Sequence, residues 1–116
     1  VRDVVTAHGL PAPELQHATD PQRPWLCDAA FAAWGVLAEL DGQLGHEGWG
    51  RVDDARRDRA TAGRGWVTVR AGWLDVAHLR CHLAAEFAAV LRARGWPGSP
   101  RPCRRTACVV RRAGDR

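Results

Sequence analysis

Residues 25–42, with the sequence WLCDAAFAAWGVLAELDG, decide the fold. This stretch holds two apolar runs, 25–32 and 36–40, separated by Trp34-Gly35. Apolar runs of this length on either side of a glycine-containing dipeptide are typical of a β-hairpin. We therefore expect two antiparallel strands joined by a two-residue turn at Trp34-Gly35.

The flanking sequence adds helices and further strands to this hairpin. The clearest helix is the last, because Leu79, Leu83 and Phe87 recur at four-residue spacing and Gly95 closes the pattern. Alternation of β-branched residues favours a strand just before it. The expected elements are a helix end over 1–8, a strand over 14–18, a charged helix over 51–62, a strand over 65–70 and a helix over 76–94. This order predicts an α/β fold with a mixed β-sheet flanked by helices.

The composition is that of one small globular domain. The chain has 116 residues, of which 46% are hydrophobic and 26% are charged, so it is too apolar for a disordered protein. Apolar runs stay far below the ~20 residues of a transmembrane helix, so we expect no membrane partner. Because the chain starts with Val1 and contains no Met, we expect a fragment, a processed chain or a GTG start codon.

The positive charge is concentrated at the carboxyl end. All 17 basic side chains are Arg, and residues 101–116 carry a net charge of +5, whereas residues 1–100 carry −1. We expect one domain over 1–100 and a basic, Arg-rich tail over 101–116. Such a tail suits DNA, which Arg104 and Arg105 would contact through phosphates, and the alternative is a solvated, disordered end.

The four cysteines are too few and too scattered for a secreted disulfide scaffold, so we expect reduced thiols and a cytoplasmic protein. Cys103 and Cys108 lie five residues apart in the tail, and Cys81 lies within about one helical turn of His78 and His82. The three sulfurs, with one of these histidines, would suit a tetrahedral Zn²⁺ site. Free thiols, or a bridge between the two tail cysteines on oxidation, are the alternatives.

Three carboxylates are expected to meet on one face of the hairpin. Glu39 and Asp41 are two residues apart on a strand, so their side chains share a face. With Ala33 opposite Val36, Asp28 falls opposite Asp41 and joins them. Close carboxylates repel by ~1–4 kcal/mol per pair unless a cation neutralises them. Their oxygens suit Mg²⁺ or Mn²⁺, which polarises a phosphodiester and activates water.

Each of these groups also has a purely structural interpretation. Glu39 could simply pair with an arginine such as Arg57, and Asp41 is a good turn residue before Gly42. His46 could carry a proton near a scissile phosphate or be a surface residue. Arg57 and Arg59, on the charged helix, could bind phosphates or form solvated ion pairs.

A series of short motifs runs along residues 7 to 103: Gly9-Leu10-Pro11, then Asp28, Leu37–Gly42, His46, Arg57-Asp58, Gly65–Arg70 and Trp73–Val76. In its order and spacing this series resembles the PD-(D/E)XK nuclease superfamily. More narrowly, it is similar to small bacterial endonuclease-like domains related to the very-short-patch repair endonucleases. The resemblance implies a restriction-endonuclease-like mixed sheet with a shortened first helix.

The resemblance also implies a metal-dependent DNA endonuclease. Asp28 and Glu39 match the metal-binding acids, His46 matches the loop histidine, and Arg57 borders the site. Asp41 stands where the superfamily name has Lys, and Arg59 replaces an amide. The alternatives are a nuclease-fold module that has lost catalysis and acts as a DNA-binding or toxin–antitoxin-type regulatory domain, and a structural fragment whose charges are all solvated.

Overall fold

The computed structural model describes residues 2–20, 22, 26–41 and 49–110. Its four strands form one sheet in the order β1-β2-β3-β4, antiparallel except for the parallel pair β3–β4. The predicted α/β class, with a mixed sheet flanked by helices, is confirmed. The elements are α1 (Arg2–Ala7), β1 (Glu14–Ala18), β2 (Leu26–Phe31), the 3₁₀ turn η1 (Ala32–Trp34), β3 (Val36–Asp41), α2 (Trp49–Gly63), β4 (Val67–Gly72), α3 (Trp73–His78) and α4 (Arg80–Ala93).

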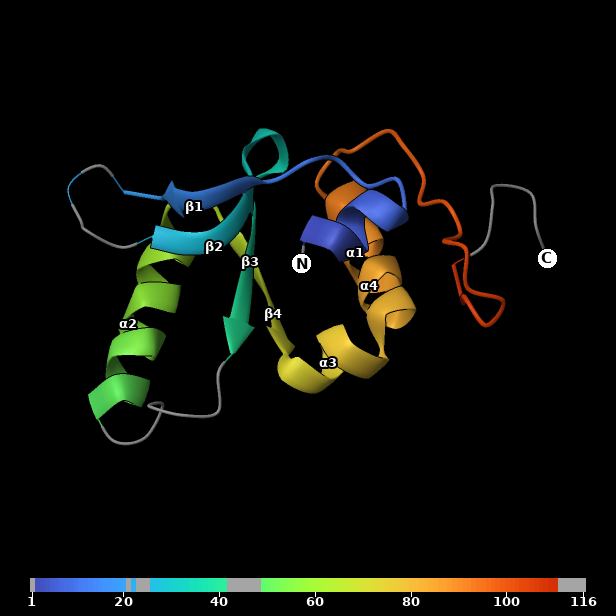
Figure 1. Ribbon diagram of the computed structural model, residues 1–116. Helices are drawn as coiled ribbons and strands as arrows, with labels where there is room; N and C mark the ends of the chain where they lie inside the picture. Colours follow the sequence, from blue (N-terminus) through green and yellow to red (C-terminus); the bar gives the residue numbers. More distant parts are fainter. Residues whose placement is uncertain (1, 21, 23–25, 42–48, 111–116) are drawn as a thin grey trace.

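Helices lie on both sides of the sheet (Figure 1). Parallel neighbours need a crossover, and α2 supplies it between β3 and β4 on one side. On the other side α1 and α4 pack against the sheet and bury the main core, in which the rings of Phe31 and Phe87 lie 5.9 Å apart. A smaller apolar cluster of Cys27, Ala30 and Leu37 is separate from this main core. The α1/α4 face therefore carries most of the apolar burial that holds the fold together.

The hairpin between β2 and β3 differs from the prediction in its turn. Phe31, not Ala33, lies opposite Val36, and the 3₁₀ turn η1 together with Gly35 makes the connection. A two-residue hairpin turn of the common type requires positive φ at both residues, which a tryptophan rarely adopts. Of Trp34 and Gly35, only Gly35 takes a positive φ, at 66°. The register therefore shifts by two residues, which by itself preserves the alternation of side chains between the two faces. Cys27 departs from this alternation, because it packs with Ala30 and Leu37 and not with Ala29 and Phe31.

The last helix is in fact two helices. The sequence predicts one helix over 76–94, but α3 begins at Trp73 and the chain breaks at Leu79, which has φ −123° and ψ 35°. The earlier start has a local cause, because the Asp75 carboxylate accepts a hydrogen bond of 2.8 Å from the Gly72 N–H. The break gives α3 and α4 different directions (Figure 1). None of the helices in the described ranges is long and apolar enough to cross a bilayer.

Residues 101–110, the described part of the expected basic tail, pack against the rest of the domain. The Arg101 N–H donates a hydrogen bond of 2.7 Å to the His8 carbonyl. Val110 is only 5% exposed and belongs to the same core cluster as α1 and α4, with Cys108 packed beside it. This segment contains no helix or strand, so its position depends on these side-chain and backbone contacts.

Candidate functional site

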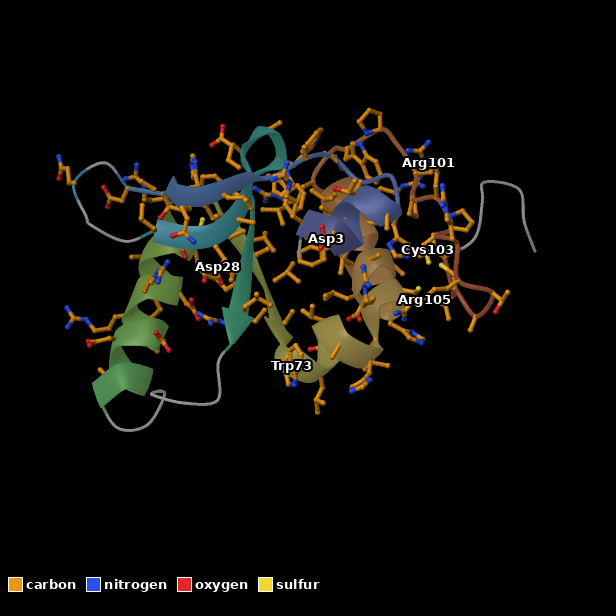
Figure 2. All side chains as sticks on the ribbon, viewed as in Figure 1. Asp3, Asp28, Trp73, Arg101, Cys103 and Arg105 are labelled. Carbon is orange, nitrogen blue, oxygen red and sulfur yellow. The ribbon has the colours of Figure 1, made fainter. Side chains whose placement is uncertain are left out.

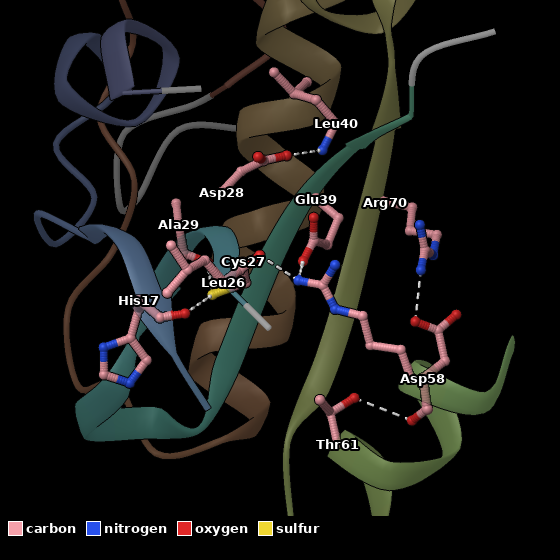
Figure 3. A network of polar contacts seen from close by, with 11 residues as sticks. His17, Leu26, Cys27, Asp28, Ala29, Glu39, Leu40, Asp58, Thr61 and Arg70 are labelled. Carbon is pink, nitrogen blue, oxygen red and sulfur yellow. Dashed lines mark hydrogen bonds and ion pairs between the residues drawn. The ribbon is translucent and has the colours of Figure 1, made fainter. Parts of the chain in front are cut away.

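The structure brings Asp28 and Glu39 together on neighbouring strands (Figure 3). Regular pairing of β2 with β3 ends at Ala29 opposite Ala38, and one further step in this register reaches Asp28 and Glu39. There the Leu40 N–H donates a hydrogen bond of 2.7 Å to Asp28 Oδ2, so a side-chain carboxylate takes the place of a backbone carbonyl as its acceptor. The expectation that Asp28 lies opposite Asp41 is wrong, because the longer turn shifts the register by two residues.

Glu39 forms an ion pair with Arg57 of α2. Arg57 Nη2 lies 3.1 Å from Glu39 Oε1 and also donates to the Leu26 carbonyl. The side chain of Glu39 is only 14% exposed and that of Arg57 is 26% exposed. The ion pair of Glu39 with Arg57, one of the two interpretations of Glu39 from the sequence, is therefore confirmed. The repulsion between the carboxylates therefore does not by itself require a metal ion, because the Arg57 guanidinium already supplies a positive charge to them.

The surroundings of Glu39 oppose its ionisation on balance. Burial raises the pKa of Glu39 above its ordinary value, and the nearby Asp28 carboxylate raises it further, while Arg57 and Arg70 act in the opposite direction. Asp58 of α2 forms a separate ion pair with Arg70 of β4, at 2.5 Å between Oδ1 and Nη2. Because Arg70 also acts on the pKa of Glu39, the two ion pairs are electrostatically linked.

The other residues expected at this site fall into two groups. The side chain of Asp41 and the whole of His46 lie outside the described residues. Arg59 is exposed on α2, and Arg104 and Arg105 are exposed in the C-terminal segment. Figure 2 shows Arg105 beside α4, well away from Asp28 across the sheet. Arg104 lines the same pocket as Arg105, next to Cys81 and Cys103, so the two tail arginines do not border the carboxylates.

Arg104 and Arg105 instead border a second polar cluster, formed by His8, Cys81, Cys103 and Cys108. One ligand atom from each of these four residues lies within 4.8 Å of every other. The sulfurs of Cys81 and Cys103 are 3.6 Å apart, and the same distance separates Cys108 Sγ from His8 Nε2. All four cysteines of the chain are free thiols, so this proximity does not come from a disulfide.

The His8 imidazole is held in one orientation. His8 is 1% exposed, and its Nδ1 lies 2.7 Å from the Val4 carbonyl oxygen. A carbonyl oxygen only accepts hydrogen bonds, so Nδ1 carries the proton and donates it. In the neutral ring this leaves Nε2 as a lone-pair donor that faces Cys108. The backbone of α1 thus prepares His8 as a metal ligand.

The thiols of this cluster differ in acidity. Burial raises the pKa of Cys81 to about 11, with further contributions from Cys108 and Cys103. Burial also raises the pKa of Cys108, but hydrogen bonds from the backbone of Cys103 and Val110 and from the side chains of Cys81 and Cys103 together outweigh it, and the pKa of Cys108 is lowered to about 6. The Arg105 N–H, 3.4 Å from Cys103 Sγ, is a further donor to sulfur. The cluster therefore supplies hydrogen-bond donors to sulfur, which favour the thiolate form that metal binding requires.

Sequence reasoning found the three cysteines of this cluster but chose the wrong histidines. His78 and His82 are exposed and are not in the four-residue group. His8, next to the helix-ending Gly9, had no motif around it that indicated a ligand. Only the packing of α1 on α4 brings it to Cys81.

Compared with protein-family models, curated proteins and solved structures, the chain matches none. The resemblance to PD-(D/E)XK nucleases therefore rests on the sequence motifs and stays a prediction.

Proposed function

We propose that this protein is a metal-dependent DNA endonuclease that hydrolyses phosphodiester bonds, with Asp28 and Glu39 as its metal ligands. The observation that carries the proposal is the meeting of these two carboxylates on adjacent strands. Asp28 is oriented there by the Leu40 N–H, and its charge acts on the partly buried Glu39. Two oriented carboxylates in a partly desolvated position are a suitable start for a cation site.

The donor set fits Mg²⁺ or Mn²⁺. Both ions prefer oxygen ligands and are bound through one or two carboxylates together with water and substrate phosphate. Such an ion polarises the phosphodiester and lowers the pKa of the attacking water. Asp41 remains the predicted third ligand, and His46 remains the predicted proton carrier.

Arg57 connects metal binding to substrate binding in this proposal. Its guanidinium now holds Glu39 and the Leu26 carbonyl. If Glu39 turns to a metal, the same guanidinium becomes available for bidentate binding of a phosphate group. Arg59, exposed on the same helix, would add a contact to the DNA backbone.

The second candidate is a nuclease-fold module that binds DNA, or acts as a toxin–antitoxin-type regulatory domain, without catalysis. The Arg57–Glu39 ion pair favours it, because a carboxylate that is already compensated does not need a metal ion. In this case the arginines would serve DNA binding alone.

A cleavage assay separates the two candidates. Supercoiled plasmid is incubated with the protein and Mg²⁺ or Mn²⁺, beside Glu39→Gln, Asp28→Asn and the control Glu86→Gln, which changes an exposed glutamate of α4. We expect the first two variants to cut at least ~10²-fold more slowly, since a metal ligand contributes several kcal/mol. Cleavage that survives Glu39→Gln contradicts the proposal. Salt-sensitive binding without cleavage supports the second candidate.

A further inference from the structure

We propose that His8, Cys81, Cys103 and Cys108 form a structural Zn²⁺ site that fastens residues 101–110 to α1 and α4. This site is independent of the carboxylates and needs no nuclease activity. The four ligands come from three separate parts of the chain: the end of α1, the first turn of α4, and the C-terminal segment. A bound ion would cross-link all three.

The distances agree with tetrahedral zinc. With Zn–S of about 2.3 Å and Zn–N of about 2.0–2.1 Å, tetrahedral angles place two sulfurs about 3.8 Å apart and a sulfur and a nitrogen about 3.6 Å apart. The observed Cys81–Cys103 sulfur pair is at 3.6 Å, and the Cys108–His8 pair is also at 3.6 Å. The remaining pairs stay within 4.8 Å, so small side-chain movements close the tetrahedron.

The ligand chemistry selects zinc over the hard cations. Three sulfurs and one imidazole nitrogen make a closed set typical of structural zinc sites. Cys103 and Cys108 are separated by four residues, a spacing found in such sites. The hydrogen bond from His8 Nδ1 to the Val4 carbonyl is the outer contact that commonly orients a zinc-bound histidine.

The electrostatic surroundings favour the same conclusion. Three thiolates and one Zn²⁺ carry a net charge of −1. Arg80, Arg104 and Arg105 line the pocket beside Cys81 and Cys103, which has a volume of about 550 Å³. Their positive charges offset this excess negative charge. The clustering of these arginines at a thiol site thus has an electrostatic reason besides any role in DNA binding.

Metal binding gives the C-terminal segment a reason to be ordered. Residues 96–110 contain no helix or strand, yet Val110 is buried in the core. Because a preformed site is absent from an unfolded chain, the free energy of zinc binding adds to the free energy of folding. The ion would therefore cross-link the chain as a disulfide does, but it would join three parts of the chain instead of two.

The test uses the full chain, purified under reducing conditions and loaded with Zn²⁺ or, as a spectroscopic substitute, Co²⁺. We expect one Zn²⁺ per chain by elemental analysis and a Co²⁺ spectrum with tetrahedral d–d bands and thiolate charge transfer. Cys103→Ser, at a half-exposed ligand, is compared with Cys27→Ser, at a buried cysteine outside the cluster. His8→Ala is compared with His82→Ala, at an exposed histidine of α4.

The outcomes are distinct. Cys103→Ser and His8→Ala should weaken Zn²⁺ affinity by more than ~100-fold, beyond the 10–100-fold cost of losing a residue that only orients a ligand. Cys27→Ser and His82→Ala should keep the stoichiometry and the Co²⁺ spectrum. Circular dichroism confirms that each variant is folded. A folded, reduced wild-type chain that binds no zinc overturns the proposal, as does equal loss in a control variant.

Discussion

The carboxylate cluster around Asp28 and the thiol cluster around Cys103 lie far apart in the molecule (Figure 2). They differ in what compensates their buried polar groups. Glu39 is compensated from within the protein, by the guanidinium of Arg57. The thiol cluster brings His8 and three cysteines to distances close to the edges of a zinc tetrahedron. The first cluster can stand without a metal ion. The second has a geometry that a metal ion explains better than packing does.

The clusters also differ in how far apart their residues lie in the sequence. Asp28 and Glu39 come from consecutive strands of one hairpin, so a local pattern could predict their meeting. His8 and Cys108 come from opposite ends of the described chain and meet only because α1 packs against α4 and the C-terminal segment. Local reasoning therefore reaches the first cluster and only part of the second.

The largest expected effect comes from removing zinc. A chelator added to the zinc-loaded chain should lower the melting temperature by ~10 °C or more, since several kcal/mol of binding energy are lost at a few degrees per kcal/mol. Differential scanning calorimetry measures this shift. Zn²⁺ should restore the stability and Mg²⁺ should not. If a chelator leaves the melting temperature of the zinc-loaded protein unchanged, the thiol cluster does not depend on a metal ion, and the two clusters do not differ in this respect.

The next effect tests whether the α1/α4 face carries the core. Phe87 is fully buried against Phe31. Phe87→Ala should lower the free energy of unfolding by ~3–5 kcal/mol, through lost burial and the cavity left behind. Urea denaturation followed by circular dichroism measures it. A cost below ~1 kcal/mol would mean that the faces share the burial more evenly than the structure shows.

A smaller effect separates the structural role of Glu39 from a metal-binding role. Arg57→Ala should cost ~1–3 kcal/mol of stability, because it leaves Glu39 partly buried without its guanidinium. If Glu39 is a metal ligand, the same change should tighten Mg²⁺ binding in titration calorimetry by removing a competing cation. Arg59→Ala, at an exposed arginine of the same helix, should change neither quantity. Unchanged Mg²⁺ binding in Arg57→Ala would favour a purely structural ion pair.

The smallest effect concerns the arginines beside the thiol cluster. Replacing Arg104 and Arg105 together by Ala should weaken DNA binding about tenfold. The slope of log affinity against log salt concentration should also fall by about two, because two phosphate contacts are lost. Fluorescence anisotropy at several salt concentrations measures both. Because Arg105 lies well away from Asp28, cleavage at saturating DNA should stay unchanged. A parallel loss of cleavage would indicate that the two regions act as one site.

Much of the fold could be predicted from periodicity and turn chemistry. The four strands lie close to their predicted positions, and α2 extends the predicted 51–62 helix by only a few residues. The errors have local physical causes. Trp34 does not take the positive φ of a tight hairpin turn, so the connection is longer and the register moves by two residues. Asp75 caps the chain at Gly72, so α3 starts earlier than the apolar spacing indicates.

The sequence by itself determined the face of most residues in the hairpin; Cys27 is an exception, because it packs with Ala30 and Leu37. Side chains alternate with a period of two, and a register shift of two residues leaves that alternation intact. The tertiary structure decided that Glu39 pairs with Arg57, which the sequence had offered only as one alternative, and that His8 rather than His78 or His82 joins the cysteines. The first depends on how α2 packs against the sheet, and the second on how α1 packs against α4. That packing is set by the summed burial of many side chains, and no short motif encodes it.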